Sequence, residues 1–91
     1  MQLLITDRFE YELSRILVFI AKNNPQNAID FKNSLMIKLQ NTISMPYACR
    51  ISAKFNQENI REFIFKGYTI IYKITENIEL LGIYRDNIWG S

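Results

Sequence analysis

Histidine does not occur among the 91 residues, and Cys49 is the only cysteine. Histidine is the usual general base near neutral pH and the commonest zinc ligand, so Ser–His and Cys–His relays are excluded within this chain. A single thiol rules out an internal disulfide and fits a reducing cytoplasm. Any chemistry would therefore come from arginine, lysine, tyrosine and carboxylate side chains, and we expect no metal and no cofactor.

The composition is that of one small folded domain over residues 1–91. Apolar residues make up 48% and charged residues 22%, as in ordinary globular proteins. The apolar run at the start ends at Asp7, too soon for a signal peptide or a membrane span. We therefore expect a cytoplasmic protein with no membrane partner.

The net charge of +2 is spread evenly along the chain. Residues 1–46 hold five Lys and Arg against four Asp and Glu, and residues 47–91 hold six against five. Nucleic-acid binding driven by charge needs a basic patch or run. Strong nonspecific binding to nucleic acid is therefore not expected.

The first half of the chain predicts a strand and two helices that would position the polar groups. Leu3–Ile5 is an apolar run that we expect to form a strand covered on both faces. Asp7 and Glu10 resemble a capping box, which predicts a first helix from about Arg8 to Lys22. The apolar stripe of this helix, with Glu10, Glu12, Arg15 and Lys22 on its other side, is Phe9, Leu13, Ile16, Leu17 and Ile20.

Asn24 and Pro25 predict the start of a second helix, because asparagine caps helices and proline is tolerated at the first helical position. This helix should end at about Ser44, before Pro46, so that a helical hairpin spans about residues 8–44. Arg50–Ser52 follows as a possible short strand. The stripe of the second helix is Ala28, Phe31, Leu35, Leu39 and Thr42, widened by Ile29, Met36 and Ile43.

Residues 60–85 predict an antiparallel meander, because runs of β-branched and aromatic residues alternate with turns that contain Gly or Asn. The overall expectation is an α+β fold of order β-α-α-β-β-β, with the helical hairpin packed on one face of an antiparallel sheet. Two-residue turns at Lys66–Gly67 and Glu76–Asn77 would pair Phe65 with Tyr68 and Thr75 with Ile78.

That pairing assigns each strand residue to one of two faces. The apolar face, expected to meet the helices, carries Arg61, Phe63, Phe65, Tyr68, Ile70, Tyr72, Ile74, Glu79, Leu81, Ile83 and Arg85. The mixed face, expected to be half-exposed and to contact a partner, carries Ile60, Glu62, Ile64, Thr69, Ile71, Lys73, Thr75, Ile78, Leu80, Gly82 and Tyr84. One bulge or one longer turn would swap these assignments.

The order of elements and four segments of the second half together resemble the RelE/ParE toxin superfamily. The segments are Ile60–Phe63, Gly67–Tyr68, Ile70–Ile74 and Ile78–Arg85, and Asn24-Pro25 with Ala28 and Phe31 is similar to the opening of the family's second helix. The resemblance covers nearly the whole chain. It implies a toxin of a bacterial type II toxin–antitoxin system, neutralised by direct contact with a cognate antitoxin.

The superfamily has two main activity classes. RelE-like members cleave mRNA on the ribosome with basic residues and often a C-terminal Tyr or His, whereas ParE-like members lack that set and poison DNA gyrase. Here Thr69 follows Tyr68 where the family often has Arg, and the segment after Arg85 contains no tyrosine. The resemblance therefore favours the ParE-like side. It implies an inhibitor that acts by binding a protein, in preference to an enzyme.

Five residues are candidates for contact with a target or antitoxin, and the first four are also weak catalytic candidates: Arg61, Lys73, Tyr84, Arg85 and Trp89. Arg61 matches the Arg-Glu pair of the family. RNA cleavage needs a base, an acid and cations that hold the phosphate. The predicted pairing separates Glu62 from Glu79 and Lys73 from Arg85, so we expect no useful RNA hydrolysis by this chain alone.

Two alternatives stay open on the same fold. One is a ribosome-dependent mRNA endonuclease, and the other is a non-toxic interaction module; a homodimer is compatible with each of them. The chain is too small to bury all of its apolar residues. We therefore expect an antitoxin to cover the exposed ones, in a groove between or beside the helices or at the sheet edge.

Overall fold

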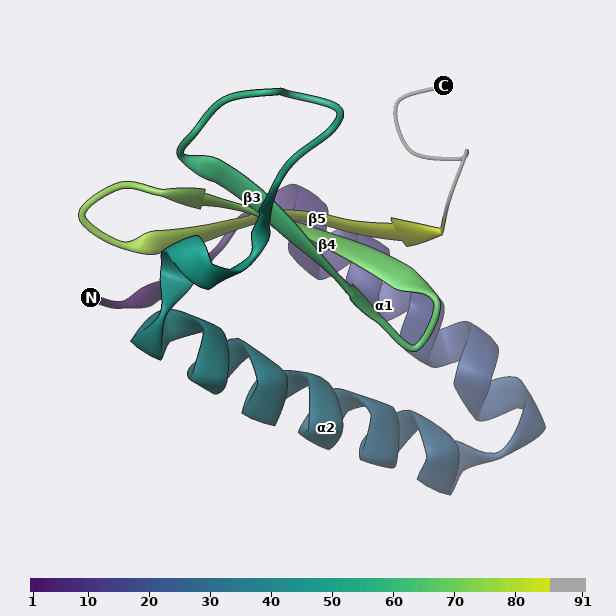
Figure 1. Ribbon diagram of the computed structural model, residues 1–91. Helices are drawn as coiled ribbons and strands as arrows, with labels where there is room; N and C mark the ends of the chain where they lie inside the picture. Colours follow the sequence, from purple (N-terminus) through teal and green to yellow (C-terminus); the bar gives the residue numbers. More distant parts are fainter. Residues whose placement is uncertain (86–91) are drawn as a thin grey trace.

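Two helices pack against a five-stranded sheet in the computed structural model, which describes residues 1–85 (Figure 1). The elements are β1 (Leu3–Ile5), α1 (Asp7–Asn23), α2 (Pro25–Ser44), the 3₁₀ helix η1 (Pro46–Ala48), β2 (Arg50–Ile51), β3 (Ile60–Phe65), β4 (Tyr68–Ile74) and β5 (Ile78–Arg85). This order confirms the expected α+β fold and the helical hairpin. Trp89 lies outside the described residues. Neither described helix is long and apolar enough to cross a membrane.

Thr6, and not Asp7, caps the first helix, which corrects the predicted capping box. The Thr6 hydroxyl accepts a hydrogen bond from the backbone N–H of Phe9 at 3.2 Å. The threonine hydroxyl competes well for this role because it sits one residue before the first helical residue, in extended backbone. The second helix begins as expected, with the Asn24 side chain accepting from the N–H of Gln26 and Pro25 at its first turn.

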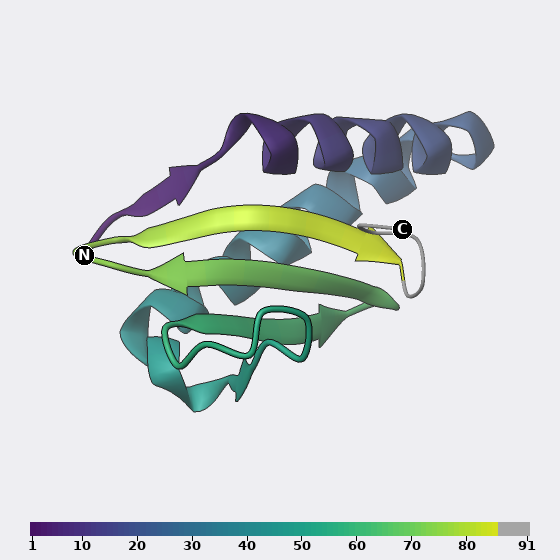
Figure 2. The same cartoon turned by 90° about the horizontal axis from the view of Figure 1, so that it is seen from above.

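The sheet has the strand order β1-β5-β4-β3-β2, and β1 pairs with β5 in parallel. The sheet is therefore mixed, with β1 added in parallel to the antiparallel meander. In the view of Figure 2, α1 continues from β1 and runs beside β5. The strand β1 is not covered on both faces, because Leu4 and Ile5 remain 41% and 48% exposed at this edge of the sheet.

The turn between β3 and β4 has two residues, as predicted, and pairs Phe65 with Tyr68. Lys66 and Gly67 both have positive φ angles, of 50° and 84°. Two successive residues with positive φ match the twist of the flanking strands, and glycine adopts this conformation without steric cost. The register of β3 against β4 follows the prediction along the whole strand.

The register of β4 against β5 follows the prediction only for Gly82–Arg85. The loop after β4 has three residues, so Ile74 pairs with Ile78, and a bulge then leaves Leu81 without a partner opposite. Ile78 and Leu80 consequently belong to the apolar face and are buried in the core. The predicted placement of Glu79 and Leu81 on that face is wrong.

The core lies between the helices and the apolar face of the sheet. The apolar residues predicted to face the core supply it. Phe9 of α1 is buried, as are Phe31, Leu35, Leu39 and Thr42 of α2, and the other predicted core residues of α1 pack against them. Ile29 does not widen the α2 stripe, because it is 53% exposed.

The mixed face is less open than predicted. Ile71, Thr69 and Glu62 on this face are at most 4% exposed. Residues 52–59 form a loop over β3 on the side away from α2 (Figures 1 and 2), and the buried Ser52 holds it by an N–H bond to the carbonyl oxygen of Ile60. This face therefore does not offer the broad partner surface that the sequence suggested.

Candidate functional site

Arg61 on β3 is bound to the backbone of the preceding segment. Its Nε donates to the carbonyl oxygen of Glu58 at 2.7 Å, and its Nη1 donates to those of Tyr47 and Cys49 at 3.1 and 2.9 Å. The guanidinium also lies 5.0 Å from the centre of the Tyr47 ring. The donors that would grip a phosphate thus already hold residues 47–58 against β3.

Tyr72 lies directly opposite Arg61 on β4 and is fully buried. Its hydroxyl donates to the carbonyl oxygen of Pro46. Burial, together with a hydrogen bond to the Cys49 side chain, raises the pKa of Tyr72 above its ordinary value. This hydroxyl is held in its protonated form and fastens η1 to the sheet.

The bulge in β5 gathers four polar side chains on the mixed face: Glu62, Lys73, Glu79 and Tyr84. The expectation that Glu62 and Glu79 lie on opposite faces is therefore wrong. Lys73 lies directly opposite Glu79 in the register. The Glu79 carboxylate accepts from the Thr75 hydroxyl at 3.1 Å.

Glu62 is 4% exposed and forms an ion pair with Arg50. Its Oε2 is 2.7 Å from Nη2 and 2.8 Å from Nε of that arginine. This ion pair ties β2 to β3. Glu62 is therefore a structural group rather than an open general base.

Arg85 lies on the opposite face from Lys73 and Tyr84, because it pairs with Tyr68 at the end of β5. Its guanidinium is 5.2 Å from the centre of the Tyr68 ring. The structure thus places Lys73 and Arg85, the two cations that nuclease chemistry would need together, on opposite faces of the sheet. Arg85 instead lines a groove beside α1. The sequence suggested a groove beside the helices but did not indicate which residues line it.

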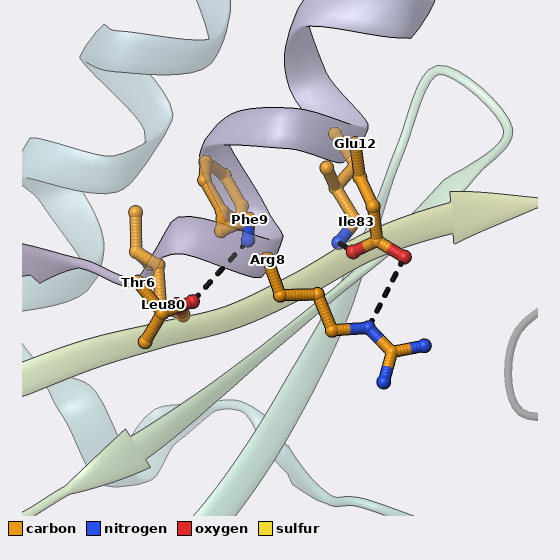
Figure 3. A network of polar contacts seen from close by, with 6 residues as sticks. All are labelled: Thr6, Arg8, Phe9, Glu12, Leu80 and Ile83. Carbon is orange, nitrogen blue, oxygen red and sulfur yellow. Dashed lines mark hydrogen bonds and ion pairs between the residues drawn. The ribbon is translucent and has the colours of Figure 1, made fainter.

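This groove lies between α1 and the end of β5 and has a volume of about 500 Å³. Two contacts set its position, one from Thr6 just before α1 and one from Glu12 in the first half of α1, and Figure 3 shows the residues that make them. Thr6 Oγ1 donates to the carbonyl oxygen of Leu80 at 2.6 Å, and the Glu12 carboxylate accepts from the N–H of Ile83 at 3.1 Å. The groove is lined by Arg8, Tyr11, Glu12, Arg15, Ile16, Phe19, Tyr68, Ile83, Tyr84 and Arg85.

The sequence analysis described the outer side of α1 only by its charged residues. The missed signal is apolar: Tyr11, Val18 and Phe19 lie on that outer side and are 62%, 60% and 64% exposed. Two further hollows lie along α1, and Phe19 lines the groove and both hollows. Among the described residues, no cluster of histidine, cysteine or carboxylate side chains could hold a metal ion.

Comparison with known proteins gives the family. Residues 3–86 match the family described as the ParE toxin of the type II toxin–antitoxin system parDE. The chain belongs to the ParE toxin family. This match confirms the resemblance to the superfamily on its ParE-like side.

A solved structure agrees with this ParE fold. The chain resembles a protein of the chromosomal ParDE toxin–antitoxin system from P. aeruginosa, with a TM-score of 0.75 and 16% sequence identity. The similarity covers 93% of this chain and 95% of the other. At this identity the similarity concerns the fold. No curated protein sequence matches the chain.

Proposed function

We propose that this ParE-family chain is the growth-inhibiting partner of a type II pair, that a cognate antitoxin neutralises it by direct binding, and that its target is DNA gyrase in the cytoplasm. Membership of the ParE toxin family supports the first part. The observation that carries the choice of target is the dispersal of the candidate catalytic groups.

Cleavage of RNA would need cations, an acid and a base around one phosphate. Arg61 is engaged by three backbone carbonyls, and Arg85 lies on the opposite face from Lys73. Glu62 is paired with Arg50. Such an arrangement favours inhibition by binding over chemistry performed by this chain.

A ribosome-dependent mRNA endonuclease is the second candidate, and one observation favours it. The bulge in β5 places Glu79 on the same face as Lys73 and Tyr84, where the predicted pairing had separated them. A carboxylate, an ammonium and a phenol on one face could serve with groups of the ribosome.

Induced expression separates the candidates. The proposal expects growth arrest with an SOS response, and gyrase-linked DNA breaks that accumulate when purified protein is added to gyrase and plasmid. Co-expression of the protein encoded beside this gene should restore growth. Codon-phased mRNA cuts that vanish in Lys73→Ala would establish the endonuclease instead, and binding of the neighbouring protein without growth arrest would establish a non-toxic module.

The same purified protein gives its oligomeric state. Light scattering of the chain alone tests for a homodimer. Twice the monomer mass would support the homodimer, and the monomer mass would contradict it.

A further inference from the structure

We propose that the outer face of α1 and the end of β5 bind an acidic segment with apolar side chains, contributed by the antitoxin. This inference rests on the proposed function for the existence of an antitoxin, and it adds the site and the chemistry of recognition. The surface consists of Tyr11, Arg15, Val18, Phe19, Lys22 and Arg85, and we call it the α1 stripe.

The α1 stripe offers apolar anchoring points in a hollowed surface. Phe19 lines the groove beside β5 and both hollows further along α1, so all three border the same aromatic side chain. Phe19 is 64% exposed and Tyr11 62% exposed, although aromatic side chains of this size usually bury a large apolar area in a protein core. Exposed aromatic side chains that border a hollow are typical contact points for a partner's apolar side chains.

The charge of the stripe selects the partner. Tyr11, Arg15, Phe19 and Lys22 follow one another at helical spacings of three and four, so basic and aromatic side chains share one side of α1. Within residues 1–85, no carboxylate lies within ion-pair distance of Arg15, Lys22 or Arg85.

The carboxylate in the groove does not compensate these cations. Glu12 lines the groove, but its two oxygens bind the N–H of Ile83 and the Nε of Arg8. Three exposed cations thus surround an apolar surface. A segment that carries Asp or Glu between apolar residues complements both properties.

Nucleic acid is less well matched to this surface. Phosphate-driven binding relies on an extended basic field, whereas the described part of the chain is nearly balanced in charge. The hollows around Phe19 are also suited to side chains that insert from a peptide. We therefore assign the stripe to a protein segment, and DNA serves as the competing probe.

The test measures binding of the purified protein encoded beside this gene, at low and at high salt. Arg15→Glu with Lys22→Glu should weaken binding at least about tenfold at low salt, and the loss should shrink at high salt because screening reduces surface electrostatics. Phe19→Ser should weaken binding by about tenfold at both salt concentrations.

Two substitutions on α2 are matched controls, because Lys32 is exposed and Ile37 is 65% exposed there. Lys32→Glu and Ile37→Ser should leave binding within about twofold, and circular dichroism checks that every variant is folded. Equal effects of the stripe and control variants would overturn the inference while leaving the proposed function intact. A short DNA duplex is the competing probe. If Arg15→Glu/Lys22→Glu no longer binds this duplex but still binds the neighbouring protein, the surface belongs to nucleic acid.

If the wild-type chain neither binds the neighbouring protein nor is neutralised by it, the proposed function itself fails.

Discussion

The carboxylate of Glu12 on α1 accepts a hydrogen bond from the backbone N–H of Ile83 on β5, with Oε1 and N 3.1 Å apart. The short strand β1 pairs only with Ile78–Leu80, so it ends before Ile83. A helix side chain therefore occupies the position that a carbonyl oxygen of a longer strand would take. An edge strand with unpaired backbone groups invites association, and Glu12 closes this part of the edge.

Replacement of Glu12 by alanine should lower the free energy of unfolding by about 1–2 kcal/mol, because the half-buried N–H of Ile83 loses its acceptor. Glu12→Gln keeps an oxygen acceptor and should lose less. Urea denaturation measures both. Glu10→Ala, on the exposed side of the same helix, is the control. Equal losses in Glu12→Ala and Glu10→Ala would show that the bond contributes nothing.

Thr6 links the start of α1 to β5 through one hydroxyl, which accepts from the N–H of Phe9 and donates to the carbonyl oxygen of Leu80. Thr6→Val keeps the shape and removes both bonds, so the free energy of unfolding should fall by about 1–2 kcal/mol. Thr6→Ser keeps the hydroxyl and should recover most of the loss. Thermal and urea unfolding of the three proteins decide, and a serine variant as weak as the valine variant contradicts the assignment.

Arg61→Lys keeps the positive charge but cannot reach three carbonyl oxygens with a planar fork. We expect a loss of about 1–3 kcal/mol in the free energy of unfolding. Arg15→Lys, at an exposed arginine on α1, should be nearly neutral. If Arg61→Lys abolishes growth arrest with unchanged stability, Arg61 contacts the target and its structural role is secondary.

The raised pKa of Tyr72 predicts the direction in which the free energy of unfolding changes at alkaline pH. The folded state favours the neutral phenol, so this contribution to stability is complete below the ordinary pKa of about 10 and declines as the pH rises further toward the folded-state value. Tyr72→Phe should make the loss of stability above that pH less steep, whereas Tyr11→Phe at an exposed site should not. Urea unfolding at several alkaline pH values tests this.

An absorbance titration gives an independent readout for Tyr72. Tyr72 should ionise only when the protein unfolds, and this delayed step should be missing from Tyr72→Phe. A wild-type titration in which all five tyrosines ionise before unfolding would contradict the prediction.

The helices and the first hairpin of the meander could be predicted because local chemistry decides them. Asn24 with Pro25 marks a helix start, and Lys66-Gly67 permits a turn with two positive φ angles. The register of β5 could not be predicted in the same way. Leu80 and Leu81 are adjacent and identical, so only the packing of the whole core decides which of them points inward.

The candidate site was predicted less well than the fold. Arg61 was identified from a family pattern, but its guanidinium binds the carbonyl oxygens of Tyr47, Cys49 and Glu58, and their proximity depends on an irregular segment. The groove beside α1 arises because α1 is anchored to β5 by Thr6 and Glu12. Contacts between residues more than 70 positions apart leave no local pattern in the sequence.

The position of β5 has a consequence for synthesis of the protein on the ribosome. This strand lies between β1 and β4, yet it is translated after both of them. A nascent chain that stops before Ile78 lacks the strand that joins its beginning to the meander, and it also lacks the core side chains of Ile78, Leu80 and Ile83. Such fragments would remain unfolded and open to proteases. An interrupted message is therefore expected to yield a degradable peptide instead of a partly active protein.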